Sequence, residues 1–166
     1  MTFKMSGFIF SMLLAAAGGV SAAGVVEVRF VEPVGYTDAG PSQREQDVNL
    51  KVLEATFHEL AQRYLRSGEV MTIDVLDVDL AGTVKPFPRG GEDKRIVRGS
   101  ADFPRIQLRY TLQRDGKPLF SRTELVSDID YTGGLSQARS VEALPYEKKM
   151  LEKWFRTSFA DVRSAG

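Results

Sequence analysis

Residues 70–82 read VMTIDVLDVDLAG, a stretch rich in the β-branched residues that favour extended backbone. Apolar side chains alternate along it, but the alternation slips by one residue between the set Met71, Ile73 and Val75 and the set Leu76, Val78 and Leu80. A β-bulge at Val75 and Leu76 inserts one residue and restores the alternation. The stretch is therefore predicted to be the central strand of a sheet, with three aspartates sharing the face away from the core: Asp74, Asp77 and Asp79.

Period-two patterns predict three more strands. They cover Val25–Glu32, with Val26, Val28 and Phe30 buried; Arg105–Gln113, with Ile106, Leu108, Tyr110 and Leu112 buried; and Leu119–Tyr131, with Leu125, Ile129 and Tyr131 buried and Arg122, Glu124, Asp128 and Asp130 outward. Asp115-Gly116 tolerates positive φ, so it predicts a tight hairpin between the last two strands.

Apolar residues at helical spacing predict two amphipathic helices. The first covers Arg44–Arg66 before the stop signal Gly68, and the second begins at Pro145 and runs to about Val162. The aromatic residues around Trp154 fit a core opposite a sheet better than a ligand box. The β-α-β-β-β-α order predicts an α+β fold, a four-stranded, mainly antiparallel sheet with two helices packed on one face and solvent on the other.

The N-terminus predicts export. Lys4 precedes an uncharged apolar run over Met5–Val20, and small residues follow at the positions that a signal peptidase reads. We expect a signal peptide over residues 1–23, cleaved before Ala23 or one residue later, and a single domain over residues 24–166. The alternative is an uncleaved membrane anchor, but the run is shorter than the roughly 20 residues that a spanning helix needs. In a Gram-negative bacterium the product would be periplasmic, with no stable membrane anchor.

The amino-acid composition argues against several kinds of binding and catalysis. The 22 basic and 22 acidic residues cancel, so no overall field favours nucleic acid. The absence of cysteine excludes disulfides and thiol chemistry, and His58 is the only histidine. No Gly-x-Ser-x-Gly nucleophile elbow occurs. We therefore expect no enzyme activity, no catalytic residue and no cofactor.

The predicted outer face of the sheet carries charge. It collects seven acids, Glu27, Asp74, Asp77, Asp79, Glu124, Asp128 and Asp130, against four bases, Arg29, Arg105, Arg109 and Arg122. Ion pairs of Arg105 and Arg109 with the neighbouring aspartates explain most of them. The alternative is a Ca²⁺ or Mg²⁺ site of a metal-binding protein or metal-dependent hydrolase, using Asp74, Asp77 and Asp79 with Asp128 or Asp130. A strand spreads alternate side chains by about 7 Å, which suits a metal poorly.

Two loops are further candidates. The connection Thr83–Pro104 is long enough to be functional or disordered, and its Ile96 and Val97 are expected to return to the core. Within it, Pro88-Arg89-Gly90-Gly91, followed by Lys94, Arg95 and Arg98, fits a flexible loop better than an anion cradle. The segment Tyr36–Asp38 is either a binding loop or a turn.

Several segments together resemble one secreted bacterial family, domain of unknown function 3016. They are VEVRFVEP, YTD at Tyr36–Asp38, RYL at Arg63, VLDVDLAG from Val75, PRIQLRYTL from Pro104 and PYEKKMLEKWF from Pro145. The chain departs from the pattern at Phe103, where the family has tryptophan. The resemblance implies an exported single domain and no catalytic residues. We therefore expect a periplasmic binding or structural domain that meets an envelope protein partner through the charged sheet face or the Thr83–Pro104 loop.

Overall fold

A computed structural model describes residues 24–85, 94–97, 101–132 and 142–164, with side chains in the last segment to Phe159. Six strands and two helices follow one another as β1 (Val25–Phe30), α1 (Gln43–Tyr64), β2 (Glu69–Asp79), β3 (Thr83–Lys85), β4 (Lys94–Ile96), β5 (Arg105–Arg114), β6 (Lys117–Ser127) and α2 (Pro145–Ser164). A short 3₁₀ helix, η1 (Pro33–Gly35), separates β1 from α1.

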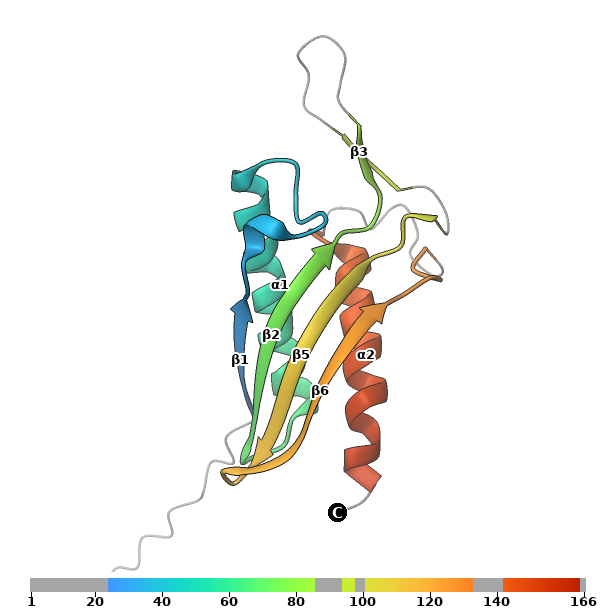
Figure 1. The fold of residues 1–166 in the computed structure, drawn as a ribbon. Coiled ribbons are helices and arrows are strands. Elements are labelled where there is room, and N and C mark those ends of the chain that lie inside the picture. The colour runs from blue at the N-terminus through green and yellow to red at the C-terminus, as the bar shows by residue number, and fades with distance from the viewer. Residues whose placement is uncertain (1–23, 86–93, 98–100, 133–141, 165–166) are drawn as a thin grey trace, which may run out of the picture.

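The main sheet has the strand order β1-β2-β5-β6. The β2–β5 and β5–β6 pairs are antiparallel, and β1 runs parallel to β2 because α1 carries the chain back between them. Both helices cover one face of this sheet, and β3 and β4 form a separate small sheet beyond the end of β2 (Figure 1). The predicted α+β fold, with both helices on one side, is confirmed.

The central strand has the predicted bulge. The register between β2 and β5 shifts between Val75 and Asp77, so that Leu76 is the inserted residue. Apolar residues on both sides of the bulge are then buried against the helices: Met71, Ile73, Val75, Val78 and Leu80. The same shift places the three aspartates of β2 on the opposite, outer face, as the slip in the alternation predicts.

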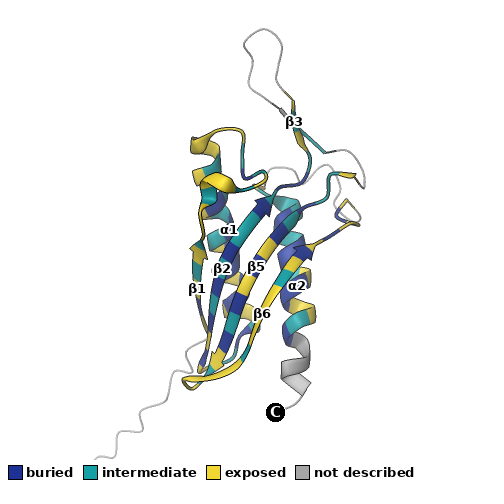
Figure 2. Cartoon of the chain, in the orientation of Figure 1, coloured by how far each residue is buried: buried dark blue, intermediate teal, exposed yellow. Residues whose placement is uncertain are grey.

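The helices close the core over β2 and β5. Helix α1 starts at the N-cap Ser42, whose side chain accepts a hydrogen bond from the backbone N–H of Glu45. Aromatic rings fill the space between α2 and the sheet, with Trp154 packed edge-on against Tyr110 and Phe159. Alternate buried and exposed residues along β5 mark its two faces (Figure 2).

The predicted faces of the fourth strand are wrong. Strand β6 ends at Ser127, and its pairing with β5 turns Phe120, Arg122, Glu124 and Val126 to the helix side. Leu125 and Ile129 are each 59% exposed, whereas Asp128 is buried and Tyr131 is buried as predicted. The inversion is stable because Glu124 accepts hydrogen bonds from the Tyr110 hydroxyl (2.9 Å) and the Trp154 indole N–H (3.3 Å).

Candidate functional site

Asp74 is the centre of an ion-pair row on the outer face. Arg29 on β1 and Arg109 on β5 lie opposite it, and their guanidinium groups donate to its two oxygens at 2.9 Å and 2.8 Å. The hydrogen bond from Arg109, supported by Arg29, holds the pKa of Asp74 below its ordinary value. Asp79 is bound in the same way by Arg105 at 2.7 Å. The predicted ion pairs of Arg105 and Arg109 are therefore present.

Asp77 fixes a loop to the sheet. Its carboxylate accepts hydrogen bonds from the backbone N–H of Thr37 (2.7 Å) and the Thr37 hydroxyl (2.8 Å). The neighbouring Tyr36 hydroxyl donates to the carbonyl of Val75 at 2.8 Å, and burial raises the pKa of Tyr36 to about 12. Asp38 then pairs with β2 through a single parallel bridge to Asp79. The Tyr36–Asp38 segment is thus a short extension of the sheet.

The two acids predicted to join this face lie elsewhere. Asp128 is on the helix side, where its carboxylate pairs with Lys153 of α2 at 2.9 Å. Asp130 is exposed beyond the end of β6. In the described part of the chain, no group of three or more His, Cys, Asp or Glu side chains has the arrangement that holds a metal ion. The outer face carries four acids and three bases, an excess of one instead of three: Glu27, Asp74, Asp77 and Asp79 against Arg29, Arg105 and Arg109.

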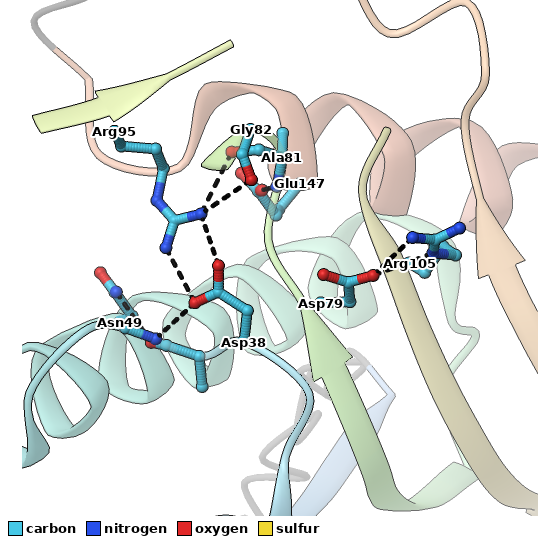
Figure 3. Close-up of polar contacts among 10 residues, drawn as sticks. Asp38, Asn49, Asp79, Ala81, Gly82, Arg95, Arg105 and Glu147 are labelled. Carbon is cyan, nitrogen blue, oxygen red and sulfur yellow. Dashed lines mark hydrogen bonds and ion pairs between the residues drawn. The ribbon is translucent and has the colours of Figure 1, made fainter. Parts of the chain in front are cut away.

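A second polar cluster lies where β2 leads into the β3–β4 hairpin (Figure 3). Arg95 of β4 makes a two-pronged ion pair with Asp38, with both N–O distances 2.9 Å. The same guanidinium group reaches the carbonyl oxygens of Ala81 and Gly82, each at 3.4 Å. A planar guanidinium matches this set of acceptors, which a lysine ammonium would not. One side chain thereby joins the hairpin, the end of β2 and the Tyr36–Asp38 segment.

Gly82 permits the close approach of the hairpin. Its φ is +87°, a conformation that favours glycine, and a Cβ placed there would lie 2.7 Å from the carbonyl oxygen of Ile96. Its N–H also donates to the carbonyl of Asp102 at 2.9 Å. Gly82 therefore lies at the point where the chain enters the hairpin, and the chain that comes back from the hairpin, at Ile96 and at Asp102, contacts the same glycine. Ile96 and Val97 are half-buried beside Gly82, but neither is among the described side chains that pack on the core, so the predicted return of this loop to the core is not observed.

Glu147 anchors the beginning of α2 to the same place. Its side chain is 2% exposed, and one carboxylate oxygen accepts a hydrogen bond from the Ala81 N–H at 2.7 Å. Burial raises the pKa of Glu147, although this hydrogen bond and the nearby Arg95 oppose the shift. A buried carboxylate at this position fixes the end of β2 between α2 and the hairpin.

A cleft separates this hairpin from α1. It has a volume of about 490 Å³ and is lined by Pro41, Ser42, Arg44, Glu45, Val48, Asn49, Val84 and Arg95. Both walls are attached to the same segment, because Asn49 of α1 donates to the Ala39 carbonyl at 2.9 Å while Arg95 holds Asp38. The cleft combines apolar side chains with two arginines, Arg44 and Arg95, and one glutamate, Glu45, in walls that the hydrogen bonds keep in place.

The remaining predicted candidates contribute little to this site. His58 is exposed on α1 and lines a separate hollow with Gly24, Val25, Val26, Ala61 and Gln62, a set without a nucleophile or carboxylate. Pro88-Arg89-Gly90-Gly91 and Arg98 lie outside the described residues. Phe103 packs against the guanidinium of Arg105, which lies 4.6 Å from the ring centroid.

The fold defines a small α+β protein with a one-sided sheet and an anchored hairpin. A family model described as "Protein of unknown function (DUF3016)" matches residues 24–157. The chain belongs to this family, which confirms the resemblance of its motifs. No curated protein and no solved structure matches the chain. Among the described residues, no helix is long and apolar enough to cross a membrane.

Proposed function

We propose that the chain is an exported protein of the bacterial cell envelope that binds a protein partner, without catalysis, in the cleft between α1 and the β3–β4 hairpin. The observation that carries this proposal is the fixed geometry of the cleft. Ordered binding sites are concave and largely preformed, with volumes of about 300–1,000 Å³, and this cleft has about 490 Å³. By contrast, the three arginines of the outer sheet face already form ion pairs with aspartates of the same face.

The lining indicates an acidic, partly apolar occupant. Val48, 53% exposed, and the half-buried Val84 supply apolar surface from opposite walls. Arg44 is an exposed cation at the beginning of α1, where the helix dipole adds positive potential. Lys85, exposed in β3, is a further cation of the hairpin. A short extended segment with a carboxylate beside an apolar side chain matches this surface, whereas a folded domain would not enter the cleft.

Export is supported by the position of the predicted cleavage site. The family match begins at residue 24 and the first strand at Val25. Cleavage before Ala23, or one residue later, would therefore leave every described element intact. Binding without catalysis is supported by the lining of the cleft, since Ser42, its one hydroxyl-bearing residue among those described, uses that hydroxyl to cap α1.

Site-specific photocrosslinking in intact cells tests the proposal. A photoreactive amino acid at Val48 or at Val84 should give the same discrete crosslinked product, which mass spectrometry identifies. A matched probe at Lys117, the exposed first residue of β6, should not give it, because the β5–β6 turn that precedes Lys117 lies at the other end of the sheet (Figure 1). Arg44→Glu should reduce the yield by reversing a charge at the cleft. Equal products from all three positions, or none from the cleft, would contradict partner binding there.

Export is read separately by fractionation. The protein should be released with the periplasmic contents by osmotic shock, with a mature N-terminus at Ala23 or Gly24. Retention in the cytoplasm at full length would contradict export but would leave the crosslinking result intact as evidence on the cleft.

A further inference from the structure

Strand β6 is a free edge of the main sheet. It is 11 residues long, and within the part of the chain that the structure describes it pairs with β5 alone. Among the described residues, no backbone–backbone hydrogen bond outside the sheet ladder involves β6. Ser121, Arg122, Thr123 and Leu125 are all exposed, so α2 does not cover this part of the strand (Figure 2). A long, uncovered edge strand is a template for pairing with another strand.

The sequence of this edge is complementary to itself. Residues 120–126 read FSRTELV, with Arg122 and Glu124 on either side of Thr123. We propose that the chain forms a homodimer by antiparallel pairing of β6 with β6 of a second copy, about a two-fold axis at Thr123. The main sheet then continues across both copies as eight strands.

This register matches side chains on both faces. On the helix side, Arg122 lies opposite Glu124 of the second copy, and Phe120 lies opposite Val126, each pair occurring twice by symmetry. Opposite charges and apolar pairs directly across antiparallel strands are both stabilising. On the outer face, Thr123 meets its own symmetry mate and Leu125, 59% exposed in one copy, lies against Ser121.

The charges needed for this pairing are available. No described carboxylate forms a salt bridge with Arg122, whose guanidinium lies over the Phe120 ring at 5.0 Å. Glu124 receives both of its hydrogen bonds at one oxygen, Oε2, so Oε1 can accept a guanidinium from outside. The pair is therefore poised for a partner of the same sequence.

The opposite edge has a similar pattern but fewer available groups. In β1, Glu27 and Arg29 flank Val28, yet Arg29 already donates to Asp74 at 2.9 Å. Edge strands are commonly protected by charged residues that reject unrelated strands. In β6, Arg122 and Glu124 disfavour pairing with a strand that does not place opposite charges against them. A second copy in this register does place an opposite charge against each.

Single cysteines test the register, because the natural chain has none. Directly opposite residues of antiparallel strands have Cα atoms about 4.5–5.5 Å apart, within the range of a disulfide. Thr123→Cys should therefore give a covalent dimer under mild oxidation. Ser127→Cys is the control, since its two copies would lie about 27 Å apart in this register. Equal yields at the two positions, or crosslinking at Val28→Cys and not at Thr123→Cys, would overturn the proposal.

Charge reversal tests the pairing. The mature protein should have twice the monomer mass by light scattering, and a monomer mass at every concentration up to the millimolar range would overturn the proposal. Arg122→Glu places like charges opposite each other, so it should weaken dimerisation at least about tenfold. Mixing Arg122→Glu with Glu124→Arg should restore a 1:1 dimer, and a mixture that stays monomeric would overturn the register. Glu124→Gln keeps the acceptor for Tyr110 and Trp154, so it should weaken the dimer without unfolding the chain.

Discussion

The ion pair between Asp38 and Arg95 should stabilise the fold far more than an ordinary surface ion pair. It contains two charge-assisted hydrogen bonds of 2.9 Å, and each side chain is only 25% exposed. Hydrogen bonds to charged groups contribute roughly 1.5–3 kcal/mol each when buried, whereas exposed ion pairs contribute about 0–1 kcal/mol. Partial exposure places this pair between these limits, so we expect a coupling free energy of about 1–2 kcal/mol.

A double-mutant cycle measures this coupling. Asp38→Asn retains an oxygen for the Gly40 N–H, and Arg95→Met retains an unbranched stem. The single tryptophan, Trp154, is 5% exposed in the core, so its fluorescence reports unfolding in urea. A loss of about 1.5 kcal/mol should lower the urea midpoint by roughly 0.5–1.5 M for a domain of this size. The cycle for Arg63 and Glu59, an exposed i,i+4 pair, is the control and should give about 0.3–0.5 kcal/mol.

A coupling no larger than that of the control pair would refute this reasoning. It would mean that water screens Arg95 as fully as a surface arginine, and that other contacts hold the hairpin. Arg95→Lys separates charge from shape, because lysine keeps the charge but loses the fork. It should lose most of the coupling as well.

Three further predictions concern titration and metal binding. Because burial raises the pKa of Glu147 in the folded state, its stabilising contribution is present below the unfolded pKa of about 4.3 and is lost as pH rises through the folded pKa. The unfolding free energy of Glu147→Gln should therefore increase relative to that of the natural chain as pH rises. A difference in unfolding free energy that does not change with pH would contradict the raised pKa of Glu147. Ultraviolet titration should show Tyr36 and Tyr110 ionising near pH 12, and each of these steps should disappear in the matching variant, Tyr36→Phe or Tyr110→Phe. Ionisation of both tyrosines near pH 10 would contradict the claim that burial raises their pKa. Millimolar Ca²⁺, Mg²⁺ or Mn²⁺ should leave the melting temperature of dialysed protein unchanged; a shift that disappears in the Asp77→Asn/Asp79→Asn variant would revive the metal hypothesis.

The sequence predicts most of the fold because its central strand carries unusually specific information. A slip in the apolar alternation around Leu76 has one structural solution, a bulge, and the bulge determines where all three aspartates point. The helices follow from long apolar stripes, which local sequence expresses clearly.

The fourth strand shows where such reasoning fails. The pattern predicts that the acids Glu124 and Asp128 face solvent, but both have hydrogen-bond partners on other elements on the helix side. Those partners, Tyr110 and Lys153, are 14 and 25 residues away. Periodicity cannot show a compensation made by tertiary contacts, and at a sheet edge the apolar pattern is too weak to correct the assignment.

The candidate site could be predicted only in part. The strand aspartates and their arginine partners follow from composition and register. The link between Asp38 and Arg95 does not, because 57 residues separate them, Asp38 lies outside any regular element and Arg95 lies in a strand of only three residues. The long Thr83–Pro104 connection was the useful signal, since loops of that length are commonly functional.

Photocrosslinking at Val84 is the most direct test of the central claim, that the Arg95-anchored hairpin forms a partner-binding cleft with α1. The measurement compares the yield of the crosslinked product in intact cells between the natural background and Arg95→Met, at matched amounts of folded protein. We predict a discrete product at Val84 that falls strongly when Arg95 is replaced, while a probe at Lys117 does not give this product in either background. An unchanged yield without Arg95, or no specific product at Val84, would contradict the claim.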